Sequence, residues 1–284
     1  MRPIALIALV LLIGLLWKIA PGKTLSEMLA LTGAEGVVTV RAEQAGFRSN
    51  PLPATQCRSC HAQHFEEWSR SFHAQSLTSD DFIRAFSHYL DSLGEQAREH
   101  PQSSMACLSC HAPVLKQAEP EIIRQVTAFV LAKETEKLAG FEVGCVACHS
   151  AGSGVFSGPI RDPQDNPFHA SKFSTSYKEA AFCANCHTWA SSTVPCSDVY
   201  TDWRKSRAAK RGATCQSCHM GEASGSAASG GPQRKIHDHL FPGGRSPAML
   251  QQAVTVRLSA AFWKDRLQVT ATVRNLVPHR VPDG

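Results

Sequence analysis

The pattern Cys-x-x-Cys-His occurs five times in this chain and uses ten of its eleven cysteines. The copies begin at Cys57, Cys107, Cys145, Cys183 and Cys215. Two thiols at this spacing can add to the vinyl groups on one edge of a haem, while the next residue's imidazole reaches the iron from one face. The repeat constrains the fold strongly, because each copy must bring three side chains to one porphyrin through a short helical turn.

Structural zinc and disulfide bonds are the competing explanations. Zinc knuckles need no histidine directly after the second cysteine, and five knuckles cannot be paired evenly into four-ligand sites. Cys-x-x-Cys-His repeats resemble no secreted disulfide framework. The sequence therefore predicts five covalently attached c-type haems. Their predicted cysteines are Cys57, Cys60, Cys107, Cys110, Cys145, Cys148, Cys183, Cys186, Cys215 and Cys218, and their predicted iron ligands on one face are His61, His111, His149, His187 and His219.

The five motifs lie between Cys57 and His219, a span too short to enclose each haem in its own pocket. The haems are therefore expected to share a core and to touch, which fits the low aromatic content of 7%. The formal net charge of +5 is a mild excess that we interpret as spread along the chain. Such a charge does not indicate nucleic-acid binding.

The amino terminus carries an apolar run from Ile4 to Trp17 after a single early Arg2. This pattern predicts that residues 1–21 form a signal peptide or a membrane anchor, followed by a linker over residues 22–54. The absence of a clear A-x-A cleavage site favours the anchor. Covalent haem attachment takes place outside the cytoplasm, so both features predict a periplasmic or extracytoplasmic protein, either exported or anchored.

Eight further histidines are candidates for the second axial ligands. His64 cannot reach the far side of a haem already held by His61, so we interpret it as a packed or solvated side chain. His73 points away by about a third of a turn and can reach a neighbouring haem. His88 falls on the polar face of its helix. His100 lies in a polar loop and could be a ligand or not. The remaining four histidines, which the residues alone do not exclude as ligands, are His169, His237, His239 and His279.

Two stretches repeat each other. Phe65-Glu66-Glu67-Trp68-Ser69-Arg70-Ser71 and Tyr200-Thr201-Asp202-Trp203-Arg204-Lys205-Ser206 share the order aromatic-x-acid-Trp-x-basic-Ser, each beside a haem motif. The position of His73 is Ala208 in the second copy. The repeat therefore predicts a packing helix, to which His73 is an addition.

From about residue 55 onward, the chain resembles the multihaem c-type cytochromes related to the tetrahaem electron carrier that serves hydroxylamine oxidoreductase. The resemblance includes Trp68-x-x-Ser71-x-His73-Ala74, Gly144-Cys145, Gly158-Pro159 and His239-x-Phe241-Pro242-Gly243-Gly244. It implies a mainly α fold with long haem-wrapping loops, here a pentahaem cytochrome c domain over residues 55–248. It also implies His73, His169 and His239 as distal haem ligands, with His237 as a bystander.

Residues 249–284 change character, because Val254 to Leu258 and Leu267 to Val273 alternate as strands. They are similar to the start of a small β-sandwich module, which is either truncated here or replaced by strands that pair with another element. The G-H-x-x-P-T-G motif of that module reads Pro278-His279-Arg280-Val281-Pro282-Asp283-Gly284 and departs at two positions. His279 is a further candidate ligand on this basis. Cys196 has no motif partner and is expected to be a buried structural thiol.

The sequence predicts an extracytoplasmic electron carrier that exchanges electrons with redox proteins or a membrane quinol-oxidising complex, with membrane association through the N-terminus and no catalytic residues. The alternative is a multihaem oxidoreductase that binds a small nitrogen or sulfur compound at one open haem. The chain has no C-x-x-C-K motif, and its supply of histidines is ample, which favours the carrier. Haem-to-haem self-assembly into filaments is a third hypothesis.

Overall fold

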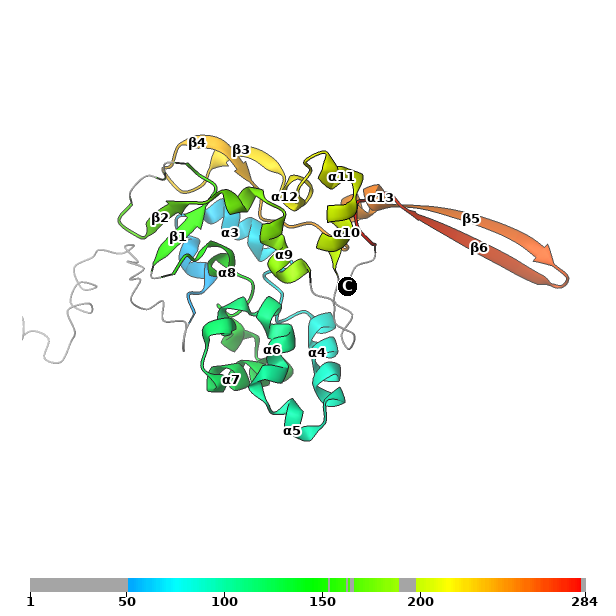
Figure 1. Cartoon of the computed structure of the whole chain (residues 1–284), viewed down its shortest axis with the longest axis horizontal. Coiled ribbons are helices and arrows are strands. Elements are labelled where there is room, and N and C mark those ends of the chain that lie inside the picture. Colours follow the sequence, from blue (N-terminus) through cyan, green and yellow to red (C-terminus); the bar gives the residue numbers. More distant parts are fainter. Residues whose placement is uncertain (1–50, 153, 162, 164–165, 189–197, 282–284) are drawn as a thin grey trace, which may run out of the picture. The chain divides into compact units, whose positions relative to one another are not determined.

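The computed structural model describes residues 51–152, 154–161, 163, 166–188 and 198–281, which all belong to one compact unit. The expected signal or anchor and the lone Cys196 lie outside these ranges. Figure 1 shows that helices predominate in the described part, as the mainly α prediction requires. Within the same ranges, no helix is long and apolar enough to cross a membrane.

The described helices are mostly short. The α-helices are α3 (Ala62–Ser69), α4 (Asp80–Ser92), α5 (Glu95–Arg98), α6 (Pro101–His111), α7 (Pro120–Leu131), α8 (Cys145–His149), α9 (Ala181–His187), α10 (Val199–Lys205), α11 (Arg207–Lys210), α12 (Cys215–His219) and α13 (Pro247–Ala253). The 3-10 turns are η2 (Ala54–Cys57), η3 (Pro113–Gln117), η4 (Thr135–Leu138) and η5 (Thr175–Lys178).

The hydrophobic core lies between α4, α6 and α7. Ser79 caps α4 by accepting a hydrogen bond from the backbone N–H of Phe82, and two acidic residues follow in the first turn. The helix then buries Phe86 and Leu90 against Leu108 of α6 and Val126 of α7. All residues of the main buried cluster come from the range 77–138.

The haem motifs form the short helical turns that their chemistry requires. Motif 2 is the end of α6, motif 3 is α8, motif 4 is the end of α9, and motif 5 is α12. Motif 1 runs from the end of η2 to the residue that precedes α3. Proline residues begin α6 and α7, where the missing N–H costs no helical hydrogen bond.

The described strands form three two-stranded sheets. β1 (Val155–Gly158) pairs in parallel with β2 (Ala170–Phe173), and β3 (Glu222–Ser226) pairs antiparallel with β4 (Gln233–His237). β5 (Val254–Trp263) and β6 (Arg266–Asn275) form a long antiparallel hairpin in the region where alternation predicts strands. Figure 1 shows β5 and β6 pairing only with each other.

One face of the β5–β6 hairpin is apolar except for Asn275 at its end. Cross-strand partners on this face include Val256 with Val273 and Phe262 with Leu267, all of them more than half exposed. The opposite face carries pairs such as Arg257 with Thr272. An isolated hairpin of two strands is marginally stable in water, so a face of this kind is typical of one half of a sandwich.

Candidate haem-binding sites

Four motif histidines are oriented by the same kind of hydrogen bond, in which Nδ1–H donates to a backbone carbonyl. The pairs are His61 with Ala227 at 2.6 Å, His111 with Ser76 at 2.8 Å, His149 with Ser157 at 2.8 Å, and His219 with Pro242 at 2.7 Å. A proton on Nδ1 leaves the lone pair on Nε2, the nitrogen that a metal can take. Each accepting carbonyl lies outside the motif that it orients.

Four of the motif histidines also face a second histidine from a distant part of the chain. The ring centroids are 6.3 Å apart for His61 and His169, 6.4 Å for His187 and His73, 6.2 Å for His149 and His239, and 6.2 Å for His219 and His279. The four residues that the sequence predicts as second ligands are therefore each brought to a different motif.

This spacing fits a haem iron between the two rings. A bond of about 2.0 Å from the metal to each nitrogen, with a ring radius of about 1.1 Å, would separate the centroids of two imidazoles on opposite sides of an iron by about 6.2 Å. A tetrahedral metal would bring the same centroids to about 5.1 Å. The observed pairs match the trans arrangement, so the histidines and the two cysteines of each motif fit a covalently attached haem better than zinc.

Three of the four second histidines form the same kind of Nδ1 hydrogen bond to a backbone carbonyl. Nδ1 donates to the carbonyl of Ala170 in His169, to that of His237 in His239, and to that of Arg280 in His279. Burial lowers the pKa of His73 to about 4, with a smaller contribution from neighbouring histidines. Burial also lowers the pKa of His239 to about 4. Both imidazoles are therefore neutral at pH 7, as an iron ligand must be.

Motif 2 differs from the other four. All thirteen histidines lie in the described part of the chain, and none of them faces His111 at the spacing of the other pairs. Its ring stacks instead on Phe82, with centroids 4.1 Å apart and planes 17° apart. Burial lowers the pKa of His111, which keeps it neutral. A haem held by Cys107, Cys110 and His111 would have one histidine ligand.

The remaining histidines have other surroundings. His64 packs beside His239, with ring centroids 4.5 Å apart, and its Nδ1 lies 3.5 Å from the Glu67 carboxylate. His88 is exposed on α4, in agreement with its predicted polar face. His100 caps α6 by accepting from the N–H of Gln102. The Nδ1–H of His237 donates to the carbonyl of Met220 at 2.9 Å.

His64, Glu67 and His239 offer ligand atoms within 4.8 Å of one another. The Glu67 carboxylate accepts hydrogen bonds from the side chain of Gln63 at 2.9 Å and from the backbone N–H of His239 at 3.0 Å. Burial raises the pKa of Glu67, but these hydrogen bonds and His64 lower it further, so it lies below its usual value. The carboxylate is therefore ionised and satisfied without a metal.

Contacts between cysteines define which motifs are neighbours. The thiol of Cys145 lies close enough to Cys57 to lower its pKa, although burial opposes this shift, so motifs 1 and 3 are neighbours. Cys110 contacts Cys186 in the same way, which joins motifs 2 and 4, and Cys183 contacts Cys215, which joins motifs 4 and 5. Cys148 of motif 3 lies close enough to both cysteines of motif 4 to shift their pKa values upward. The five motifs thus form one connected group.

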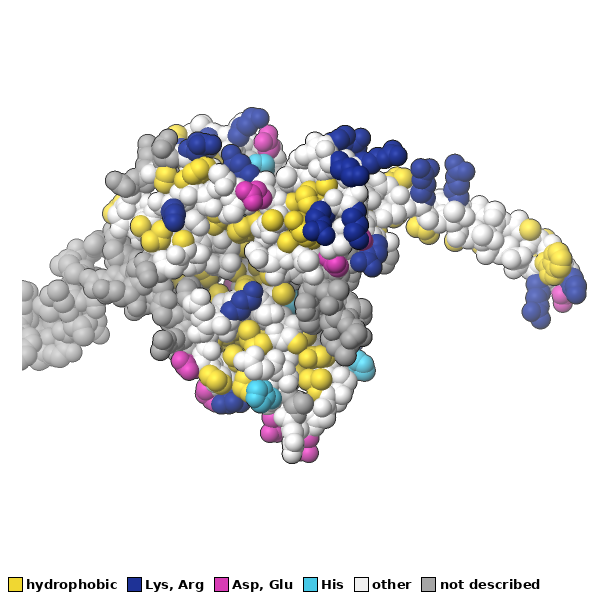
Figure 2. All heavy atoms as spheres, in the orientation of Figure 1, with side chains coloured by type: hydrophobic (Ala, Val, Ile, Leu, Met, Phe, Trp, Pro, Cys, Tyr) yellow, Lys and Arg dark blue, Asp and Glu magenta, His cyan; other side chains and the backbone are white. Residues whose placement is uncertain are grey.

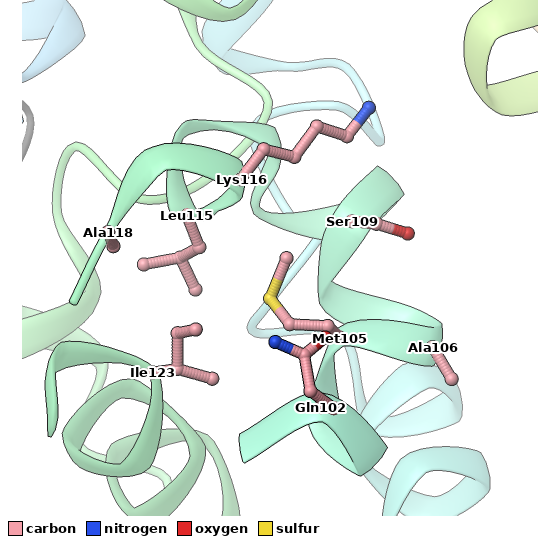
Figure 3. Close-up of a pocket in the computed structure, with 8 residues that line it drawn as sticks. All are labelled: Gln102, Met105, Ala106, Ser109, Leu115, Lys116, Ala118 and Ile123. Carbon is pink, nitrogen blue, oxygen red and sulfur yellow. The ribbon is translucent and has the colours of Figure 1, made fainter. Parts of the chain in front are cut away.

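A pocket of about 420 Å³ lies between α6 and residues 115–123. Figure 3 shows Leu115 and Ile123 facing Met105 across it. Met105 and Ser109 are four residues apart and share a helical face, whereas Cys107 and Cys110 are rotated away from that face. Ser109 and Lys116 nevertheless interact with Cys110, so the pocket borders the predicted haem site of motif 2.

Comparisons with known proteins agree with this geometry. A family model described as cytochrome c554 and c-prime matches residues 56–150, which contain the first three motifs. The fold is similar to that of a penta-heme cytochrome c552 from Thermochromatium tepidum. The TM-score is 0.53 at 22% identity, over 82% of this chain and 68% of that chain. These findings support a multihaem c-type cytochrome. A search of curated proteins finds no match for this chain. The relation to the tetrahaem electron carrier that serves hydroxylamine oxidoreductase stays a prediction.

Several contacts that organise the sites have no sequence signature. The carbonyls of Ser76, Ala227 and Pro242 orient motif histidines, and any residue carries such a carbonyl. The acid of the aromatic-x-acid-Trp repeat does have a signal. The repeat marks Glu67 and Asp202 in advance, although it does not say what they bind.

Proposed function

We propose that this chain is an extracytoplasmic pentahaem c-type cytochrome that carries electrons between redox partners. The observation that supports this most directly is the set of four histidine pairs whose ring centroids are 6.2–6.4 Å apart. One histidine of each pair belongs to a motif with two cysteines. Bound haem would supply a one-electron iron couple at each motif. Two imidazole ligands leave no open position for a substrate, which suits a carrier.

The residues of this chain would divide the work as follows. The ten motif cysteines hold the porphyrin edges, and the five motif histidines bind iron from one face. His169, His73, His239 and His279 bind the opposite faces at motifs 1, 4, 3 and 5. The contacts between motifs 1 and 3, 3 and 4, 2 and 4, and 4 and 5 give short steps for electrons. The apolar N-terminal run and covalent haem attachment support an extracytoplasmic location and association with a membrane or a quinol-oxidising complex.

A second function is favoured at motif 2, because the ring contacts of the described residues pair His111 with Phe82 and with no second histidine. A haem there would keep an open position that a small nitrogen or sulfur compound could occupy. In this second proposal the chain is an oxidoreductase at motif 2, supplied with electrons through motif 4.

Electron paramagnetic resonance of the ferric holoprotein separates the two functions. The carrier with four histidine pairs predicts four low-spin haems, and an open motif 2 adds one high-spin haem that binds nitric oxide or cyanide. If all five haems are low-spin and ignore these ligands, the oxidoreductase is excluded. If several haems are high-spin, the histidine pairs are not ligand pairs and the carrier proposal loses its support. A haem count other than five per chain would overturn the pentahaem assignment.

A further inference from the structure

The two copies of the aromatic-x-acid-Trp repeat have the same local geometry. In α3, the rings of Phe65 and Trp68 are 5.7 Å apart, and in α10 those of Tyr200 and Trp203 are 5.5 Å apart. The aromatic pair occupies one face of each helix, because the two rings are three residues apart. The acid between them, Glu67 or Asp202, points to a different face.

Each acid accepts a hydrogen bond from a second histidine or from the residue beside it. Glu67 accepts from the backbone N–H of His239 at 3.0 Å. Asp202 accepts from Nε of Arg280 at 2.7 Å, and Arg280 directly follows His279. His239 faces motif 3 and His279 faces motif 5. Two copies of one sequence pattern therefore contact two separate ligand segments through the same repeat position.

We propose that Glu67 and Asp202 are positioning residues for the distal ligands at motifs 3 and 5. This inference rests on the proposed ligand roles of His239 and His279. Glu67 is 9% exposed, and its bond to the backbone of His239 fixes the ligand's own main chain. Asp202 and Arg280 are more exposed, with 31% and 66% of their side chains accessible, so their ion pair is weaker.

The test measures how strongly each internal histidine competes with cyanide for its iron. A hydrogen bond to a charged, buried acceptor contributes about 1.5–3 kcal/mol, so Glu67→Ala should raise the cyanide affinity of one haem at least about tenfold. An exposed ion pair contributes less than about 1 kcal/mol, so Asp202→Ala should raise it by about fivefold at most. Glu67→Gln retains an acceptor oxygen, so its cyanide affinity should stay close to that of the wild type.

Glu66→Ala is the matched control, because Glu66 precedes Glu67 and forms only an exposed ion pair with Arg58. It should leave cyanide binding unchanged. In a His239→Ala background, Glu67→Ala should add nothing to cyanide affinity, since the ligand it positions is gone. If Glu67→Ala lowers the melting temperature but leaves cyanide binding at the wild-type value, the positioning role is overturned. If His239→Ala itself produces no high-spin haem, the ligand assignment fails instead.

A separate observation concerns charge. Arg204, Lys205, Arg207, Lys210 and Arg211 are all exposed on and beside α10 and α11, and none has an acidic partner among the described residues. Figure 2 shows the Lys and Arg side chains gathered over α10 and α11. We name this surface the α10–α11 basic patch. It corrects the expectation that the positive charge is spread along the chain.

The patch adjoins motif 5, which begins four residues after Arg211. Cys218 of motif 5 is the exposed member of the ten motif cysteines, and the others are half-buried. By its cysteine contacts, motif 5 joins the group through motif 4 and forms one end of it. A haem held at motif 5 would lie beside five cations that have no acidic partner among the described residues, which would suit electron exchange with an acidic protein.

We infer that the α10–α11 basic patch docks an acidic redox protein at motif 5, a partner for the proposed carrier function. The probe is a plant-type ferredoxin, which is acidic and strongly reducing. When it reduces the ferric cytochrome, ferredoxin loses one electron and one haem iron gains it, with no proton required. Binding of the oxidised ferredoxin to the ferric holoprotein is measured by surface plasmon resonance, and reduction by stopped flow.

The variant Arg207→Gln/Lys210→Gln/Arg211→Gln should lower the association rate constant at low salt at least about tenfold and flatten its salt dependence. The control Lys172→Gln/Lys264→Gln/Arg266→Gln removes three exposed cations elsewhere and should have little effect. Equal losses in both triple variants would overturn the docking site. Binding to vesicles of phosphatidylglycerol and phosphatidylcholine that depends on the patch, without ferredoxin binding, would assign the patch to a membrane. If dithionite reduces no haem, the carrier function fails rather than the docking site.

Discussion

Ser76 lies at the centre of a hydrogen-bond network that connects three of the motifs. Its Oγ donates to the carbonyl of His111 at 2.8 Å and accepts from the N–H of Val143 at 3.0 Å, just before motif 3. The carbonyl of Val143 in turn accepts from the indole N–H of Trp68, which follows motif 1. Ser76 is 8% exposed, so little water reaches these bonds.

The substitution Ser76→Ala leaves the Val143 N–H and the His111 carbonyl without partners. Each unsatisfied buried group costs about 1–3 kcal/mol, so the loss of unfolding free energy is about 2–4 kcal/mol when the exposed side of the site is allowed some hydration. For a folded part of this size, 1 kcal/mol corresponds to a shift of about 2–4 °C, so the melting temperature should fall by about 4–16 °C.

The assay is thermal unfolding of the holoprotein by circular dichroism, with the haem absorption spectrum recorded in parallel. The control is Ser69→Ala, which removes an exposed hydroxyl that donates to the carbonyl of Glu66 and should shift the melting temperature by no more than about 2 °C. The spectrum of Ser76→Ala should match the wild type, because the Ser76 carbonyl that orients His111 remains. Equal melting temperatures for both variants would refute the reasoning.

Three further predictions concern the ligands, the hairpin and the haem-free chain. Replacing any one second histidine by alanine should convert one haem to high spin in electron paramagnetic resonance; these histidines are His73, His169, His239 and His279. The control His88→Ala should leave all spin states unchanged. Leu258→Gln/Phe262→Gln should raise solubility in light scattering without lowering the melting temperature, because these side chains are 71% and 78% exposed. After chemical removal of haem, hydrogen exchange should retain protection in α4, α6 and α7 and lose it in α8, α9 and α12, since the buried cluster lies at 77–138. Uniform loss of protection would contradict this last expectation.

The sequence predicts the motifs well because their chemistry is local. Two cysteines and one histidine within five residues predict a haem attachment site, and motifs 2 to 5 lie in helices that end at the motif histidine. The pairing of second histidines is not local. His73 points away from motif 1 in the sequence pattern, but only tertiary packing brings it to His187 of motif 4 rather than to another iron.

The same limit explains what the sequence could not predict about motif 2. A supply of eight further histidines suggests that every haem can have two histidine ligands. Phe82 reaches His111 because α4 packs against α6, and this contact depends on the core rather than on any motif. The basic patch had a readable signal, since its five cations fall within residues 204–211, but averaging the charge over the whole chain hid it.

The distribution of buried residues suggests why the second ligands come from distant segments. The motifs after residue 138 have almost no apolar core of their own, with only small buried residues such as Ala180 and Ala253 beside Val146 and Ile236. A chain of this length needs more buried apolar surface than that to hold its fold. Haems between histidines from separate segments would provide that surface and join the segments at the same time. In this part of the molecule, the residues proposed to bind iron are therefore also the residues on which folding depends.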